Sequence, residues 1–200
     1  MTMIIFVFYR KDNITMREER QITMDELLQL ATEAAGLITR QYWHWTGGDY
    51  NTTHTDKYHI AIKGDGTMWT SCTSLAEKLN HTFMRNSNSV GINICACLDA
   101  VHQNNLGPYP PTEAQLNTLS QVAAAICINA GIPLDIQHCM THAEAADNRD
   151  GWYAHEPYGP DTTVERWDLD VLREGEPPRS GGDSIRGNAR YYATQWGSII

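Results

Sequence analysis

Apolar residues three and four positions apart mark two long stretches of the chain, residues 24–36 and 112–130. This spacing places the apolar side chains along one face of a helix. Each stretch starts with a capping box, Thr23-Met-Asp-Glu26 in the first and Thr112-Glu-Ala-Gln115 in the second, a pattern typical of helix N-termini. We therefore predict a helix over each stretch, and a short C-terminal helix over residues 184–196.

Shorter apolar runs, some continuous and some alternating with polar residues, predict strands. The predicted strands cover residues 3–9, 41–46, 58–63, 67–71, 90–98 and 134–142. Gly64-Asp-Gly66 joins two of them in a predicted hairpin over residues 58–71. Residues 90–98 alternate, with Asn93 on the face opposite the isoleucines, which indicates a central strand with one semi-polar face.

Helices that alternate with several strands indicate an α/β fold. A chain of 200 residues suits one domain with a single core. We predict a mixed central β-sheet with helices on both faces and a cleft at one rim. This domain covers residues 1–172, and residues 173–200 form a linker and the short C-terminal helix.

Composition and charge exclude several classes of partner. The formal net charge is −9, and phosphate binding depends on clustered Lys and Arg, so we expect no nucleic-acid partner. No apolar run approaches the roughly 18 residues of a membrane-spanning helix, so we expect no membrane insertion. The apolar run Ile4–Tyr9 precedes the nearest basic residues, which indicates a strand and not a signal peptide. We expect a monomer, made in the cytoplasm without an export signal.

The five cysteines, an odd count without a CxxC pair, favour buried free thiols over a disulfide framework. The histidines are better suited to chemistry, because a hydrolytic zinc site needs three His or carboxylate ligands and one open position for water. Four of the eight histidines lie in predicted strands or at strand ends: His44, His59, His138 and His142. Taken singly, each is better explained as a half-buried structural histidine, and the HExxH motif is absent.

Short segments around these histidines follow a definite order along the chain. They are His44-Trp-Thr46, Tyr58-His-Ile-Ala-Ile-Lys63, Asp65-Gly-Thr67, His81, Asn86-Ser-Asn-Ser-Val-Gly-Ile92, the helix over 112–130, Thr141-His-Ala-Glu144 and Arg166-Trp-Asp-Leu169. Their order resembles that of the type 2 N-acetylmuramoyl-L-alanine amidases, the family that includes phage amidase-lysozymes and animal peptidoglycan recognition proteins. The resemblance covers roughly residues 38 to 172.

The resemblance implies a role for each matched residue. His44, His142 and Asp168 would hold a Zn²⁺ ion. Tyr58 and Arg166 would stabilise the oxyanion that develops when water attacks the amide carbonyl, since donors and cations placed there act on the transition state. The residues expected along the peptidoglycan-binding groove are Trp45, His81, Asn86, Asn93 and Glu144.

Three departures from the family pattern bear on these roles. Arg166 stands where the family has Lys, and Arg cannot act as an acid near neutral pH. Asn93 stands where many members have Glu, and an amide cannot accept a proton as a base. The segment between His142 and Asp168 is longer than usual, which leaves three rival third ligands: Asp150, His155 and Asp161. His138 could also pair with His142 on one metal ion if their segment were helical.

The expected function is that of a zinc-dependent N-acetylmuramoyl-L-alanine amidase, a phage or prophage endolysin that acts on the cell wall after release. Muropeptides in the cytoplasm are an alternative substrate. Proton transfer falls to Tyr58, Glu144 or metal-activated water. Two other functions stay open: a peptidoglycan-binding protein of the same fold that does not cut, and a zinc peptidase acting on stem peptides. A complete His, His, Asp ligand set would favour an enzyme.

Overall fold

A six-stranded mixed sheet forms the centre of the computed structural model, which describes residues 18–151 and 166–198. Its strands are β1 (Arg20–Ile22), β2 (Arg40–Trp45), β3 (Ile60–Ile62), β4 (Met68–Thr70), β5 (Ser89–Ile94) and β6 (Cys139–Thr141). In the order β1-β4-β3-β5-β2-β6, the first three strands are antiparallel and the pairs from β3 to β6 are parallel. The predicted mixed sheet and β3–β4 hairpin are confirmed, and the strand predicted over 3–9 lies outside the described residues.

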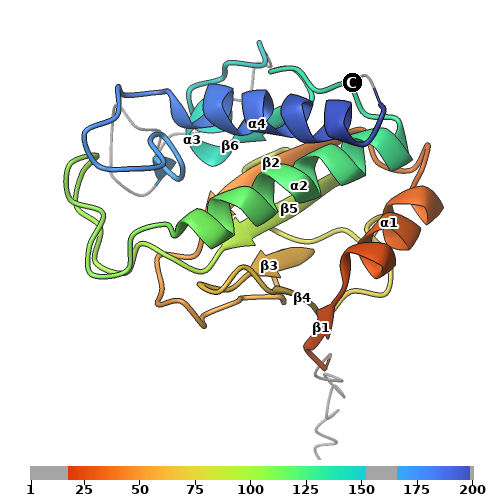
Figure 1. Ribbon diagram of the computed structural model, residues 1–200, viewed down its shortest axis with the longest axis horizontal. Helices are drawn as coiled ribbons and strands as arrows, with labels where there is room; N and C mark the ends of the chain where they lie inside the picture. The colour runs from red at the N-terminus through yellow and green to blue at the C-terminus, as the bar shows by residue number, and fades with distance from the viewer. Residues whose placement is uncertain (1–17, 152–165, 199–200) are drawn as a thin grey trace, which may run out of the picture.

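Three helices lie together on one face of this sheet (Figure 1): α1 (Met24–Glu33), α2 (Glu113–Ala130) and α4 (Gly181–Gln195). Both predicted capping boxes form, with the Thr23 and Thr112 side chains at the starts of α1 and α2. The apolar side chains between the helices and the sheet form one continuous core. The parallel strands β2 and β5 are buried over almost their whole length, as strands covered on both faces must be.

The opposite face of the sheet carries the short helix α3 (His142–Ala146). Ala145 of α3 packs against Tyr42 and Met140 in a second, smaller apolar cluster. Helices therefore flank the sheet on both faces, as predicted, but the three longer ones share a single face. Loops cover much of the other face, and this asymmetry leaves room there for a cleft.

Four of the predicted strands are longer than the observed ones, and for two of them, over residues 90–98 and 134–142, the structure shows a local cause. β5 ends at Ile94, and the left-handed backbone at Cys97, with φ 69°, no longer continues a strand. β6 begins only at Cys139, because the Asp135 side chain accepts hydrogen bonds from two following backbone amides and forms a turn. The chain then enters α3 at His142, where the sequence reading placed a strand end.

The C-terminal helix starts at Gly181, inside the stretch predicted as a linker, and packs in the same core as α2 through Ile185 and its neighbours. Its close approach needs two glycines. A Cβ on Gly181 would lie 1.9 Å from the Leu169 carbonyl oxygen, and one on Gly182 would lie 2.3 Å from the Glu144 carboxylate. The predicted boundary at residue 172 stays a prediction.

All five cysteines are buried free thiols, as expected. None of the helices in residues 18–151 and 166–198 combines the length and the hydropathy that a membrane span requires.

Candidate metal centre

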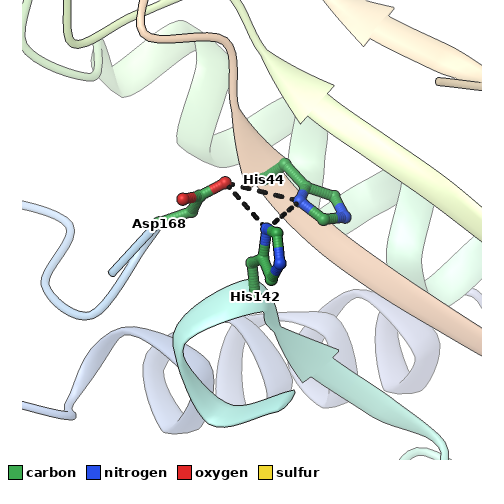
Figure 2. A group of neighbouring side chains, drawn as sticks. All are labelled: His44, His142 and Asp168. Carbon is green, nitrogen blue, oxygen red and sulfur yellow. Dashed lines mark hydrogen bonds and ion pairs between the residues drawn. The ribbon is translucent and has the colours of Figure 1, made fainter. Parts of the chain in front are cut away.

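Three side chains from separate segments converge at one edge of the sheet (Figure 2). His44 lies near the end of β2, His142 is the first residue of α3, and Asp168 lies in the loop before α4. The Nδ1 atoms of His44 and His142 are 3.0 Å apart, and Asp168 Oδ2 lies 3.4 Å from the first and 3.3 Å from the second. All three residues are buried. The structure thus brings together the ligand set expected from the sequence.

The spacing of these atoms fits a zinc ion. Zn²⁺ binds His nitrogen and carboxylate oxygen at about 2.0–2.1 Å in a tetrahedral arrangement, which places neighbouring ligand atoms about 3.3 Å apart. The observed separations run from 3.0 to 3.4 Å. A shared cation would take a lone pair from each of the two imidazole nitrogens that face each other at 3.0 Å. Across residues 18–151 and 166–198, no other three His, Cys, Asp or Glu side chains lie close enough to share an ion.

The fold positions each member of the cluster through its backbone. β2 and β6 are parallel neighbours, so His44 in one and His142 just beyond the other reach the same edge of the sheet. The Thr141 capping box turns the chain into α3 at His142. The Asp168 carbonyl accepts a hydrogen bond from the Ala143 amide at 3.3 Å, which fastens the third segment to the start of α3.

The charge state of Asp168 suits a metal ligand. Burial by itself would raise the pKa of this carboxyl, but the neighbouring imidazoles of His142 and His44 outweigh burial and hold the pKa below its ordinary value. The carboxylate is therefore ionised, as coordination requires.

One rival third ligand has a different partner. Asp150 accepts hydrogen bonds from Arg85 Nε and Nη2, both at 2.9 Å, and both side chains are fully buried. Its carboxylate is committed to this ion pair and lies outside the metal cluster. The other two rivals, His155 and Asp161, lie outside the described residues.

The two remaining candidate histidines have structural roles. His138 Nδ1 lies 2.7 Å from Asp135, and the residues after it form β6, so the helical pairing considered for it does not occur. His59 Nδ1 accepts a hydrogen bond from the Gly91 amide at 3.0 Å, and its Nε2 donates to the Glu77 carbonyl at 2.7 Å. Both ring nitrogens of His59 therefore serve the backbone.

A cleft of about 630 Å³ opens beside the cluster. Binding sites for small molecules typically span roughly 300–1,000 Å³. The described residues that line the cleft are Trp45, Thr46, Gly47, Lys57, Tyr58, Asn80, His81, Thr82, Phe83, Asn86, Cys97, Asp99, Ala100, His142, Arg166, Trp167 and Asp168. Two of the candidate ligands thus face a space that can hold a substrate.

Tyr58 and Arg166, the residues expected to stabilise charge, both line this cleft. The Tyr58 ring centroid lies 4.9 Å from that of His44, beside the candidate ligands. Burial, and after it the charge of Asp168, raises the pKa of Tyr58 above its ordinary value. Its phenol therefore stays protonated at neutral pH and can donate a hydrogen bond. Arg166 is half-buried and permanently charged.

Three of the five residues expected to bind substrate line the cleft: Trp45, His81 and Asn86. The Trp45 ring stands edge-on against Trp167, with centroids 4.5 Å apart and an interplanar angle of 88°. Burial, followed by the nearby His44 and His59, lowers the pKa of His81 to about 2. Asn86 also shapes the loop, since its Oδ1 accepts the backbone amide of His81 at 3.0 Å.

The other two expected substrate residues lie away from the cleft, and these expectations are corrected. Asn93 is fully buried, and its Nδ2 donates to the Thr53 carbonyl at 2.7 Å, so the loop over residues 51–57 covers it. Glu144 pairs with Arg186 through contacts of 2.7 and 2.8 Å and accepts the Thr141 amide at 3.0 Å. Its carboxylate holds α3 to α4 and cannot serve proton transfer in the cleft.

Sequence reasoning missed several residues that line the cleft, above all Thr82. Its hydroxyl oxygen lies 3.3 Å from His44 Nε2 and 2.9 Å from His81 Nδ1. Its position directly after His81 in a matched segment was the available signal, but threonine is common in loops and carries no chemistry by itself.

The profile of the N-acetylmuramoyl-L-alanine amidase family matches residues 32–156, a range that includes His44 and His142 but ends before Asp168. No curated protein sequence matches the chain.

Five solved protein chains match the structure, and they include the two that follow. The endolysin N-acetylmuramoyl-L-alanine amidase LysCS from Clostridium intestinale URNW is 18% identical, with a TM-score of 0.41 over 55% of this chain and 73% of that one. The Drosophila peptidoglycan recognition protein SD is 14% identical, with a TM-score of 0.41 over 64% of this chain and 85% of that one. At TM-scores of 0.41 the family assignment rests on the sequence match alone.

Proposed function

We propose a function from the premise that this chain belongs to the N-acetylmuramoyl-L-alanine amidase family. The protein hydrolyses the amide bond between N-acetylmuramic acid and L-alanine in peptidoglycan, with a zinc ion held by His44, His142 and Asp168. The observation that carries this proposal is the triangle of two Nδ1 atoms and one carboxylate oxygen, with edges of 3.0 to 3.4 Å, beside a cleft.

The completeness of the ligand set supports an enzyme over a binding protein of the same fold. Three protein ligands leave a fourth tetrahedral position free, which is the arrangement of catalytic zinc sites. A zinc ion in this position would polarise the scissile carbonyl and lower the pKa of attacking water toward neutrality.

The remaining chemistry falls to side chains that line the cleft. Tyr58 donates a hydrogen bond from its protonated phenol to the oxygen of the scissile carbonyl, where negative charge develops. Arg166 places a fixed positive charge at the same cleft and cannot release a proton near neutral pH. Trp45 and His81 offer ring surfaces to the substrate. Since Glu144 is paired with Arg186 outside the cleft, the attacking water itself supplies both groups: its hydroxyl bonds to the carbonyl carbon, and a proton goes to the leaving nitrogen as the C–N bond breaks.

The proposal includes the setting expected from the sequence. The protein is a phage or prophage endolysin that reaches intact cell wall, and soluble muropeptides in the cytoplasm are the alternative substrate. Activity on whole sacculi compared with soluble muropeptides distinguishes the two settings, because an endolysin must release peptide from the insoluble polymer.

The test pairs metal analysis with digestion of purified peptidoglycan. The wild-type protein should bind one zinc ion and release new L-alanine amino termini without new reducing sugars. Asp168→Asn should lose both zinc and cleavage. His138→Gln is the matched control, since this histidine lies outside the cluster and bonds Asp135, and it should retain both properties.

The other outcomes identify the alternatives. Zinc bound without cleavage would show a binding protein, and new amino termini within the stem peptide would show a peptidase. Full activity in Asp168→Asn would refute the proposed third ligand.

A further inference from the structure

A chain of hydrogen-bonding groups leads away from His44 on the side opposite the metal cluster. His44 Nε2 lies 3.3 Å from Thr82 Oγ1, which lies 2.9 Å from His81 Nδ1. His81 Nε2 lies 3.4 Å from Ser89 Oγ, and Ser89 Oγ donates to the Arg85 carbonyl at 2.6 Å. The four side chains of this relay, from His44 to Ser89, are all buried, and buried polar groups are as a rule hydrogen-bonded, which gives these contacts weight.

The direction of each bond follows from the far end. The Arg85 carbonyl can only accept, so it takes the Ser89 hydroxyl proton. The Ser89 oxygen is then the acceptor for His81 Nε2–H. His81 Nδ1, the other ring nitrogen, faces Thr82 Oγ1 at 2.9 Å. A neutral imidazole with a proton on Nε2 has an acceptor on Nδ1.

The same reasoning gives the direction of the hydrogen bonds at the His44 end of the relay. The Thr82 hydroxyl donates its single proton to His81 Nδ1, so the Thr82 oxygen can only accept from His44 Nε2–H. With its proton on Nε2, His44 has a lone pair on Nδ1, the atom that faces His142 Nδ1 at 3.0 Å. In the opposite tautomer an N–H would point into the metal cluster, and no ligand lone pair would be available there.

We propose that Thr82 is a positioning residue, which fixes the tautomer and ring orientation of His44 as an Nδ1 metal ligand and is itself oriented by His81. This inference deepens the proposed function, since it rests on the proposed metal site. It gives His81 a task that is independent of substrate, although its ring also lines the cleft.

The backbone around the relay is built to hold it in place. Asn86 Oδ1 accepts the backbone amides of both His81 and Thr82, at 3.0 and 2.8 Å. The His81 ring lies directly on β5, where a Cβ at Gly91 would come within 2.5 Å of its Cγ. These contacts hold the loop in the conformation that presents the Thr82 hydroxyl to His44.

Thr82→Val removes the hydroxyl and keeps the shape of the side chain. Partners that orient metal-bound histidines typically change metal affinity by roughly 10–100-fold when they are lost. We expect Thr82→Val to weaken the zinc Kd by about this factor, measured by competition with a chromogenic chelator, and Thr82→Ser to restore it. Thr118→Val is the matched control, since its hydroxyl donates to the Gly66 carbonyl outside the cluster, and it should bind zinc as the wild type does.

A second measurement does not depend on affinity. Nitrogen–proton NMR correlations of the histidine rings in the zinc-loaded protein should show His44 bound through Nδ1 with its proton on Nε2. In Thr82→Val the Nε2 proton should exchange with solvent faster than in the wild type. Melting of the metal-free variants shows whether the fold is intact, and Thr82→Ala, which also lacks the hydroxyl, takes the place of Thr82→Val if that variant does not fold.

The outcomes separate this inference from the proposed reaction. Wild-type zinc affinity in Thr82→Val, or His44 bound through Nε2, would overturn the relay while leaving the amidase proposal standing. A protein that binds zinc and shows the expected loss in Thr82→Val, yet never cuts peptidoglycan, would keep the relay and overturn the amidase. A wild-type protein that binds no zinc would overturn both.

Discussion

The ion pair between Arg186 and Glu144 offers a quantitative test of how the C-terminal helix supports the site. Arg186 donates to both Glu144 carboxylate oxygens, at 2.7 and 2.8 Å, and to the Cys139 carbonyl at 2.8 Å. The pair joins α4 to α3, the helix that starts at His142. Replacing Arg186 with Met keeps much of the side-chain volume and removes every one of these donors.

The expected loss of stability follows from burial. The Arg186 and Glu144 side chains are only 4% and 5% exposed, so Arg186→Met strands a carboxylate that water cannot reach. Breaking a buried pair by removing one partner costs about 3–5 kcal/mol. The exposed pair Arg173–Glu113 has similar bidentate contacts of 2.7 Å, but its side chains are 47% and 69% exposed. Exposed pairs contribute about 0–1 kcal/mol, so Arg173→Met is the matched control.

Urea unfolding of the metal-free protein measures both losses without a contribution from zinc. We expect Arg186→Met to lower the free energy of unfolding by about 3–5 kcal/mol and Arg173→Met by less than about 1 kcal/mol. The double variant Arg186→Met/Glu144→Leu should recover most of the loss, short of about 1 kcal/mol for the α3 cap that Glu144 completes. Equal losses in Arg186→Met and Arg173→Met would refute the claim that this buried pair holds α4 to α3.

Three further predictions concern the site itself. Tyr58→Phe should lower kcat on soluble muropeptides by roughly 10²–10³-fold with zinc affinity unchanged, because the variant lacks the phenol donor; an unchanged kcat would contradict that role. Zinc at about 100 times its Kd should stabilise the native state by about 2.7 kcal/mol, and excess chelator should abolish the gain in melting temperature. Asp168→Asn should remove this zinc-dependent shift, whereas Asp150→Asn should keep it while lowering stability with and without zinc, since Asp150 pairs with Arg85. If Asp150→Asn lost the zinc-dependent shift and Asp168→Asn kept it, the third ligand would be Asp150 and not Asp168.

Local signals in the sequence were enough to predict much of the fold. The capping boxes at Thr23 and Thr112 fixed the starts of α1 and α2, because the bonds they describe join residues three apart. The Gly64-Asp-Gly66 turn gave the β3–β4 hairpin for the same reason. The sheet order depends on contacts between distant segments, and no local pattern contains it.

The site was predictable where residue context was distinctive. His44 and His142 each end a strand segment in a matched motif, and both reached the cluster. The choice between Asp168 and Asp150 could not come from spacing, because it depends on Arg85, which lies far away in sequence and pairs with Asp150.

The two misplaced substrate residues show what strand alternation leaves out. Alternation placed Asn93 on the face opposite the isoleucines, and the β5–β2 register sets it beside His44, yet its amide donates to the Thr53 carbonyl of a loop that covers it. For Glu144 the signal was present, since Thr141-His-Ala-Glu144 is itself a capping box and predicts a structural carboxylate. Its partner Arg186 lies on another helix and could not be inferred.

One experiment can identify the bond that is cut and show whether cleavage depends on the metal cluster. Digestion of peptidoglycan in water enriched with heavy oxygen, followed by mass spectrometry, should place the label in the lactyl carboxylate of muramic acid and leave an unlabelled L-alanine amino terminus. Asp168→Asn should give neither product, and His138→Gln should give both. Label in a carboxylate of the stem peptide, or undiminished cleavage by Asp168→Asn, would contradict a zinc amidase built on His44, His142 and Asp168.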